Sequence, residues 1–306
     1  MESIKDRLLF AIPKKGRLFE TCNELLAGAD FQFFRSNRLD VCLVQNHPIA
    51  LVFLPASDIP RFVGEGNVDI GITGQDRIEE SQMWPHVNEV LKLGFGKCKL
   101  QVQVPEHGTI QSVEDLAGKR VATSFSNIGG GYFREVDRRV GEERGMLVET
   151  KIEYVGGSVE AACALGLAEG IVDLVESGET MRAAGLHPIA TVIPTEAVLI
   201  TSKKRIAEGP KASFAPLIRL IISRLAGVVA SRKFVLLAYN IPREKLVEAS
   251  LVTPGQRSPT VSSLEETGWV AVNVMVERAK VAQVMDQLQE IGAVDLLVTK
   301  LENCRI

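Results

Sequence analysis

Short apolar runs alternate with amphipathic stretches along most of the chain, and this alternation predicts an α/β protein. Leu8–Ile12, Ala50–Leu54 and Val68–Ile72 have the length and composition of buried strands. Apolar residues at helical spacing predict helices over Arg17–Ala27 and Asp58–Val63. Such strand–helix alternation favours a mainly parallel sheet with helices on both faces.

A second α/β unit is expected to begin near Lys99. Its predicted strands are Leu100–Val104, Arg120–Thr123, Lys151–Val155 and Ile171–Val175, and its predicted helices are Tyr132–Glu143, after the glycines 129–131, and Ser158–Leu165. The extended segment Thr191–Thr201 is long enough to return to the first unit. Two lobes of this kind form a cleft, and small ligands bind in such clefts.

The pattern changes after Pro210–Ser231, which predicts a strongly apolar helix. Strands are expected at Phe234–Tyr239, Pro259–Leu264, Trp269–Met275 and Asp295–Leu301, with helices at Pro242–Ala249 and Lys280–Ile291. This order, βαββαβ, is the ferredoxin-like pattern. The sequence therefore predicts one lobe from residues 1–98 and 187–227, a second lobe from residues 99–186, and a C-terminal domain from residues 228–306. The tail has no catalytic cluster, which favours a ligand-sensing or assembly role.

Composition narrows the class of protein. The 306 residues carry 35 basic and 38 acidic side chains, a net charge of −3, which argues against a nucleic-acid partner but allows a local basic pocket. Five cysteines without a CxxC pair and four separated histidines are typical of a reduced, cytoplasmic protein without a transition-metal site. The N-terminal residues lack the apolar core of a signal peptide, and no apolar run is long enough to span a membrane.

The strongest candidate for chemistry is the segment GIVDLVESGETMRAAGL, residues 170–186. An apolar strand ends in Glu176, Ser177, Gly178, Glu179 and Thr180, and a helix is expected to follow. Free N–H groups at a helix start, with hydroxyls beside them, suit a phosphate, while carboxylates such as Asp173 and Glu176 suit sugar hydroxyls. The parts together fit a ribose 5-phosphate. The alternative is a plain capping serine and a turn glycine, and Glu179 would repel a phosphate unless it points away.

A basic turn forms the second candidate. In AIPKKGRL, the cations Lys14, Lys15 and Arg17 flank Gly16 where a strand gives way to a helix. Strand ends at the carboxyl edge of an α/β sheet face the ligand crevice. Three cations there suit a polyphosphate, although a solvated basic turn has the same sequence.

Weaker candidates come from two other turns. Ser158, in VGGSVE, is placed to cap the next helix and to expose further N–H groups, although capping alone explains a serine. Asp69 and Asp76, in VDIGITGQD, are expected near the cleft, although aspartate is common in surface turns.

These motifs, together with GKCKLQVQVP, GKRVATSF and GGSVEAACALGLAEG, resemble ATP phosphoribosyltransferase, the first enzyme of histidine biosynthesis. The segment TPGQRSPTVSSLEETGWVAV resembles the regulatory domain of the family's long form, as found in fungi. The matches run in order over nearly the whole chain. The resemblance implies two periplasmic-binding-protein-like lobes and a ferredoxin-like regulatory domain.

The resemblance also implies a reaction. Such enzymes join N1 of the ATP adenine to C1 of phosphoribosyl pyrophosphate, release pyrophosphate and need Mg²⁺, which would be held mainly by substrate oxygens rather than by a protein metal site. Histidine would act as a feedback inhibitor. The family forms homo-oligomers that shift between dimers and hexamers.

The resemblance assigns roles residue by residue. Asp173 and Glu176 would lie by the ribose, and the 5-phosphate would be held by Ser177, Gly178, Glu179 and Thr180. Lys14 and Arg17 would be catalytic, and the ATP or pyrophosphate phosphates would be bound by Lys14, Gly16, Arg17, Asp76 and Ser158. Asn240 and Thr260 would bind the regulatory histidine.

Two departures from the family pattern affect this assignment. Pro55 stands where many relatives have arginine, so one cation of the nucleotide site is missing or supplied elsewhere. Asn240 stands where some long forms have aspartate, so an ion pair to the histidine ammonium would become a neutral contact.

Two other functions fit parts of the sequence. Bilobal solute-binding proteins share phrases such as SVEDLAGKRVAT. Exported receptors of this kind need a secretion signal and regulators of this kind need a helix-turn-helix, and the sequence shows neither pattern. An inactive paralogue that only assembles with an active subunit is a third reading.

Overall fold

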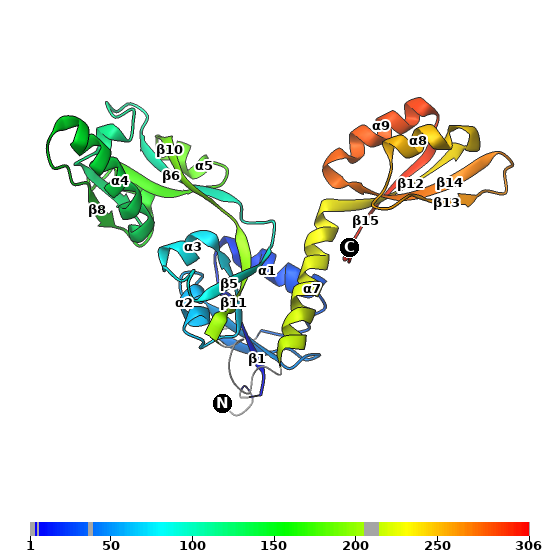
Figure 1. The fold of residues 1–306 in the computed structure, drawn as a ribbon, viewed down its shortest axis with the longest axis horizontal. Helices are drawn as coiled ribbons and strands as arrows, with labels where there is room; N and C mark the ends of the chain where they lie inside the picture. Colours follow the sequence, from blue (N-terminus) through cyan, green and yellow to red (C-terminus); the bar gives the residue numbers. More distant parts are fainter. Residues whose placement is uncertain (1–3, 5, 36–38, 205–213, 306) are drawn as a thin grey trace. The chain divides into compact units, whose positions relative to one another are not determined.

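The structure is a computed structural model that describes residue 4 and residues 6–35, 39–204 and 214–305, with the side chain of Arg17 also outside the description. The chain divides into two compact units (Figure 1). The larger unit comprises Met1–Asn23 and Gln32–Ala215, and the smaller one comprises Glu24–Phe31 and Pro216–Ile306.

The first lobe of the larger unit is built on a six-stranded sheet in the order β2-β3-β1-β4-β11-β5. Its strands are β1 (Leu8–Pro13), β2 (Val41–Leu43), β3 (Ile49–Leu54), β4 (Ile70–Gly74), β5 (Val87–Lys92) and β11 (Ala197–Ser202), and its helices are α2 (Ile59–Gly64) and α3 (Gln75–Glu80). β1 runs parallel to β3 and β4, whereas β2 and β11 pair antiparallel with their neighbours. The expected mainly parallel sheet is therefore a mixed one.

The second lobe is built on a five-stranded sheet in the order β10-β6-β9-β7-β8. Its elements are β6 (Cys98–Pro105), η2 (Glu114–Leu116), β7 (Arg120–Thr123), α4 (Ser126–Arg144), β8 (Lys151–Tyr154), η3 (Val159–Ala161), β9 (Gly170–Val175), α5 (Glu179–Ala183) and β10 (Leu186–Thr195). β7 runs parallel to β8 and β9, and β6 runs antiparallel to β9 and β10. Apolar residues of the sheet and of α4 form one core cluster. The carboxyl end of β9 is thereby held beside the start of β6.

The smaller unit contains the four-stranded antiparallel sheet β13-β14-β12-β15. Its elements are α7 (Ala215–Lys233), β12 (Phe234–Pro242), η5 (Arg243–Lys245), α8 (Leu246–Val252), β13 (Thr260–Ser263), β14 (Trp269–Glu277), η6 (Arg278–Lys280), α9 (Val281–Ile291) and β15 (Val294–Lys300), and α1 (Arg17–Gly28) passes from the larger unit into this one. Alternate residues of β12 and β14 are buried and share one core with α8 and α9. The predicted βαββαβ order is confirmed.

Several sequence predictions need correction. The glycines 129–131 lie inside α4 and do not precede it, because the helix begins at Ser126. The helix predicted over Ser158–Leu165 is only the short 3-10 turn η3. Thr191–Thr201 divides between β10 in the second lobe and β11 in the first, so only its second half returns to the first sheet. Residues 210–213 of the predicted apolar helix lie outside the described residues.

The assignment of catalytic and regulatory tasks to residues 1–227 and 228–306 stays a prediction. Contact within the chain groups α7 with the C-terminal sheet, from Pro216 onward. Within the described residues, no helix combines the length and the hydrophobicity needed to cross a membrane.

Candidate active site

Residues 176–180, here called the site loop, comprise the turn after β9 and the first two residues of α5. Gly178 has φ +76°, a left-handed backbone conformation that favours glycine. A Cβ at this position would lie 2.7 Å from Nη1 of Arg182, so that guanidinium would have to shift to admit a side chain. Nη2 of Arg182 donates to the carbonyl of Ser177 at 3.1 Å. The turn is thus shaped by one glycine and braced by one arginine.

Two cavities flank the site loop. The smaller, of about 300 Å³, is lined by all the residues that the sequence predicted for phosphoribosyl binding (Asp173, Glu176, Ser177, Gly178, Glu179 and Thr180), together with Gln103, Glu160, Leu174, Val175 and Met181. The larger, of about 580 Å³, shares Glu176, Ser177 and Gly178 with it and carries four cations: Lys92, Lys97, Lys99 and Arg182. Nζ of Lys92 lies 3.5 Å from a carboxylate oxygen of Glu196. The site loop therefore separates an acidic cavity from a predominantly basic one.

Asp173 lies near the end of β9, with its side chain in the smaller cavity. Burial raises the pKa of its carboxyl above the ordinary value. The hydrogen bond from the N–H of Leu174, at 2.8 Å, lowers that pKa, the nearby charge of Glu160 raises it, and the charge of Arg77 lowers it. Because burial makes the charged carboxylate less stable, a hydrogen bond from a sugar hydroxyl or contact with a cation would stabilise it.

The sequence analysis missed other residues of this site. Gln103 and Glu160 line the smaller cavity, and Lys99 and Gln101 line the larger one. Lys99, Gln101 and Gln103 alternate with buried residues along β6, so one face of that strand points toward the cavities. Their period-two spacing in GKCKLQVQVP was a signal that sequence reasoning could have used.

The basic turn lies at the end of β1. The N–H of Lys14 donates to the carbonyl of Leu54 at 2.8 Å, which fastens the turn to the end of β3. Gly16 has φ +86° and no heavy atom within 4 Å of where a Cβ would lie. α1 begins at Arg17, whose side chain lies outside the described residues. Neither Lys14 nor Gly16 lines the two cavities beside the site loop.

Arg35 lies at the same sheet edge, although no sequence motif pointed to it. Its guanidinium carbon is 3.8 Å from the ring centroid of Phe53, and its Nη1 is 3.5 Å from the carbonyl oxygen of Lys14. Phe53 stands two residues before Pro55 at the end of β3. The structure thus places a cation on the ring of Phe53, two residues before Pro55, the position at which the resemblance predicts an arginine in many relatives.

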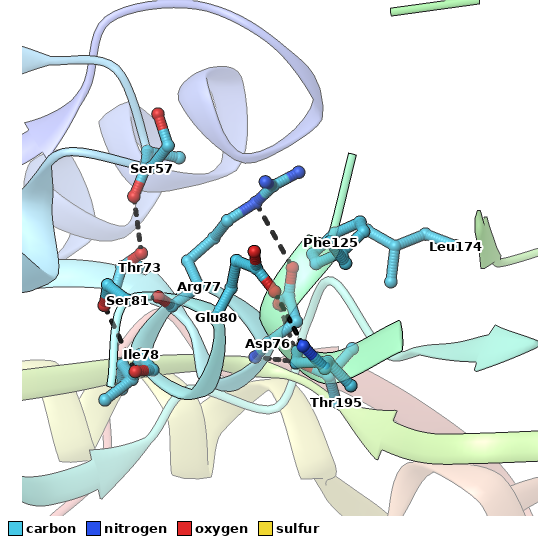
Figure 2. Close-up of polar contacts among 12 residues, drawn as sticks. Ser57, Thr73, Asp76, Arg77, Ile78, Glu80, Ser81, Phe125, Leu174 and Thr195 are labelled. Carbon is cyan, nitrogen blue, oxygen red and sulfur yellow. Dashed lines mark hydrogen bonds and ion pairs between the residues drawn. The ribbon is translucent and has the colours of Figure 1, made fainter. Parts of the chain in front are cut away.

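Asp76 is engaged within the protein. It is buried, and its Oδ1 accepts from the hydroxyl of Thr195 at 2.8 Å, while its own N–H donates to the same hydroxyl oxygen at 3.0 Å (Figure 2). Its Oδ2 is 3.4 Å from Nε of Arg77. Asp76 is not among the residues lining the two described cavities, and its ligand-binding role stays a prediction.

Ser158 precedes η3 with φ +50° and makes no side-chain capping bond. Its expected capping of a full helix is therefore wrong, and its role toward phosphate stays a prediction. Among the described residues, no group of three or more histidine, cysteine, aspartate or glutamate side chains is placed to hold a metal ion.

The predicted effector residues lie in the smaller unit. Thr260 is in register with Asn273, which is in register with Ala238, two residues before Asn240. Because residues opposite each other project to the same side of a sheet, Thr260 and Asn240 share the face that α8 and α9 do not cover. Nδ2 of Asn240 donates to a carboxylate oxygen of Asp295 at 2.9 Å.

Comparison with known proteins places these features in context. The family model described as ATP phosphoribosyltransferase matches residues 55–227, and the model described as "HisG, C-terminal domain" matches residues 231–303. The ATP phosphoribosyltransferases of Yarrowia lipolytica, Schizosaccharomyces pombe and Saccharomyces cerevisiae are 53%, 51% and 50% identical to this chain, covering 100%, 99% and 99% of it and 99%, 98% and 98% of their own lengths.

A solved structure supports the fold. The ATP phosphoribosyl transferase (HisG:HisZ) complex from Thermotoga maritima matches with a TM-score of 0.57 at 22% identity, covering 72% of this chain and 96% of that chain. At this identity the match bears on the fold alone, and it agrees with the two-lobed α/β architecture described above.

Proposed function

Since this chain belongs to the ATP phosphoribosyltransferase family, we propose that its larger unit transfers the phosphoribosyl group of phosphoribosyl pyrophosphate to N1 of ATP and releases pyrophosphate. This is the first step of histidine biosynthesis. The observation that carries the proposal is the site loop, whose predicted residues all line one cavity.

Phosphoribosyl pyrophosphate would occupy the smaller cavity. Asp173 and Glu176 would accept hydrogen bonds from the ribose hydroxyls. Ser177, Gly178, Glu179 and Thr180 would hold the 5-phosphate, with the bare backbone at Gly178 allowing close approach. Because Glu179 is exposed, its carboxylate is free to point toward solvent and away from the phosphate.

The remaining phosphates would meet cations from both lobes. Lys14, Gly16 and Arg17 of the basic turn would face the triphosphate of ATP or the pyrophosphate. Arg35, held on the ring of Phe53, would supply the cation that Pro55 does not. The lysines of the larger cavity add positive charge directly beside the site loop.

The chemistry needs positioning more than it needs a reactive side chain. The adenine N1 lone pair attacks C1 of the ribose, the bond from C1 to pyrophosphate breaks, and positive charge develops on the ring in between. Pyrophosphate leaves readily once its charge is neutralised by the cations described above. Placing the two substrates in line and neutralising the leaving group therefore supply most of the catalysis.

Mg²⁺ is part of this proposal. The carboxylates of Asp173 and Glu160 are hard oxygen donors in the smaller cavity, and they suit a cation that takes one or two protein carboxylates and otherwise keeps waters and substrate phosphates. When bound, the ion would neutralise pyrophosphate oxygens. The protein's own part is to hold Asp173 by the Leu174 N–H and to keep both carboxylates facing the cavity.

The smaller unit would bind histidine as feedback inhibitor on the open face of its sheet, at Asn240 and Thr260. Asn240 is neutral, but Asp295 is bonded to it and would supply the carboxylate for the histidine ammonium. We also propose that the protein forms homo-oligomers, as dimers and hexamers, and that it is located in the cytoplasm.

One assay tests the function. The purified protein is mixed with ATP, phosphoribosyl pyrophosphate and Mg²⁺, and product is followed by ultraviolet absorbance, with and without histidine. Product that forms only with both substrates and is reduced by histidine supports the whole proposal. Binding of substrates without product under any condition would favour a binding module or an inactive paralogue.

A further inference from the structure

The two lobes of the larger unit meet at a contact that the reaction scheme above does not use. Arg77 and Glu80, both on α3 of the first lobe, contact Phe125, Asn127 and Ile128 at the start of α4 in the second lobe. We call these five residues the clasp. Figure 2 shows Arg77, Glu80 and Phe125.

Glu80 caps a helix that belongs to the other lobe. Its carboxylate oxygens accept from the N–H of Asn127 at 3.0 and 3.1 Å and from the N–H of Ile128 at 3.0 Å. In return, Nδ2 of Asn127 donates to the carbonyl of Glu80 at 2.7 Å. The first N–H groups of a helix have no partner within it, and they attract a negative charge. Phe125, at the capping position of α4, makes no side-chain cap, so Glu80 takes that place.

Arg77 forms the second half of the clasp. Its guanidinium carbon lies 4.1 Å from the ring centroid of Phe125, and its Nε is 3.4 Å from Asp76. Asp76 is bonded to Thr195, at the end of β10, just before the chain passes into the first sheet. Arg77 therefore contacts Asp76, which is bonded to the end of β10, and also Phe125, which belongs to the core of the second lobe.

The clasp adjoins the proposed site. The N–H of Phe125 donates to the hydroxyl of Thr123, which donates to the carbonyl of Val172, the residue before Asp173. Leu174 packs against the core that contains Phe125. The positive charge of Arg77 also acts on the Asp173 carboxyl, where it lowers the pKa.

The chain connects the two sheets at residues 93–97 and at Glu196, and both connections are single strands of backbone. The two connections are bonded to each other, because the N–H of Ala197 donates to the carbonyl of Phe95 and its carbonyl accepts from the N–H of Leu93. The clasp adds side-chain contacts between the lobes to this backbone link. From this geometry we propose that Arg77 and Glu80 are positioning residues for phosphoribosyl transfer, because the clasp fixes the first lobe, with its basic turn, against the lobe that carries the site loop.

The inference rests on the proposed function and makes a kinetic prediction. Misplacement of reacting groups by about 1 Å costs up to about 100-fold in rate. Loosening the clasp should therefore lower kcat more than it weakens the binding of either substrate. A role in folding alone would lower thermal stability and leave kcat per folded molecule unchanged.

The test compares Glu80→Ala and Glu80→Gln with wild type in the full-length protein. We expect kcat to fall about tenfold for Glu80→Ala, which corresponds to about 1.4 kcal/mol, with KM for each substrate changing less than about threefold. Glu80→Gln keeps one accepting oxygen and should lose about threefold. Amide hydrogen exchange at Asn127 and Ile128 should quicken in the same order. Arg77→Ala should lower kcat in the same direction.

The matched control is Glu143→Ala, which removes an exposed carboxylate from the far end of α4, the helix that Glu80 caps, and should behave as wild type. Wild-type kcat in both Glu80 variants, or a loss of kcat without faster exchange at Asn127 and Ile128, contradicts the clasp. If Glu80→Ala does not fold, the Glu80→Gln comparison decides. A wild-type protein that makes no product contradicts the proposed function itself, whereas an active wild type with equally active variants contradicts only the clasp.

Discussion

The site loop and the clasp use polar groups in opposite ways, although both adjoin β9 and its core. In the clasp, the carboxylate of Glu80 accepts from two backbone N–H groups, and the neighbouring pair of Asp76 and Thr195 is buried with both groups bonded. In the site loop, Ser177 and Thr180 are exposed beside a cavity, and the bond that the serine hydroxyl accepts from the N–H of Glu179 is long, at 3.4 Å.

This difference separates two tasks that look alike in the sequence. Asp76 and Thr195 satisfy each other inside the fold, so breaking that pair leaves a buried group without a partner. The bonds between Glu80 and Asn127 lie at the surface and satisfy the first N–H groups of α4. Polar residues that line a cavity are available to a ligand. Changes in the site loop should therefore act mainly on activity, and changes at Asp76 should act mainly on stability.

The largest effect is expected from Gly178→Ala. Alanine disfavours φ +76°, and its Cβ would displace the guanidinium of Arg182, which donates to the carbonyl of Ser177, so the geometry proposed to hold the 5-phosphate changes. We expect kcat/KM for phosphoribosyl pyrophosphate to fall about 100-fold, the size typical of losing a positioned anion contact, with a loss of about 1 kcal/mol in unfolding free energy. Steady-state kinetics and urea unfolding measure the two quantities.

Gly145→Ala is the matched control for backbone strain. Gly145 also has a positive φ, +65°, but it ends α4, and nothing lies within 4 Å of its Cβ position. It should lose a similar amount of stability and keep wild-type kinetics. Equal kinetic losses in the two variants would show that strain, and not the site loop, sets the rate.

Asp76→Ala should produce the next largest effect, on stability. Removing the carboxylate leaves the buried hydroxyl hydrogen of Thr195 without its acceptor and Arg77 without its carboxylate neighbour, which should cost about 2 kcal/mol in unfolding free energy. The control is Asp58→Ala, at an exposed aspartate, which should change the unfolding free energy by less than about 0.5 kcal/mol. A normal urea midpoint combined with a raised KM for ATP would instead make Asp76 the ligand residue that the sequence suggested.

These cases show what the sequence could predict and why the rest needed the structure. The residues of the site loop are contiguous and follow one apolar strand, so a local motif was enough to place them together. Asp76 and Thr195 are 119 residues apart, and Glu80 and Asn127 are 47 apart. Which polar group meets which across such distances depends on how the lobes pack, and no local pattern records it.

The start of α4 illustrates the same limit. The glycines 129–131 disfavour a helix by their intrinsic propensity, and the sequence therefore predicted a start at Tyr132. The helix begins at Ser126 instead. A cap from Glu80 and packing of Ile128 and Phe133 into the core outweigh the glycines, and both contributions come from residues distant in sequence.

Thr180→Val is expected to have a smaller effect on activity. The substitution keeps the shape of the side chain and removes the hydroxyl proposed to bind the 5-phosphate, so KM for phosphoribosyl pyrophosphate should rise about tenfold, equal to about 1.4 kcal/mol. Thr180→Ser restores the hydroxyl and should restore most of the affinity. If the serine and valine variants bind equally well, the hydroxyl does not contact the phosphate.

The smallest expected effect concerns Asp173, which shares properties of both regions because it is partly buried in a strand and lines the cavity. Burial raises the pKa of its carboxyl above the ordinary value of 3.8. A carboxyl with a raised pKa in the folded protein contributes stability that is fully present below the unfolded pKa and is lost as the pH rises through the folded pKa. Asp173→Asn removes this loss, so the variant should unfold at a slightly higher urea concentration than wild type near neutral pH.

The advantage should disappear as the pH is lowered below 3.8, where Asp173 is protonated in both states. Asp115 provides a control of opposite sign, because the N–H groups of Gln111 and Ser112 bond its exposed carboxylate and lower its pKa. Asp115→Asn should therefore lose stability near neutral pH and approach wild type in acid. If Asp173→Asn behaves like Asp115→Asn, the Asp173 carboxylate stabilises the folded unit. Asp173 would then act as a structural group, like Glu80 of the clasp, and not as a ligand-binding group of the cavity.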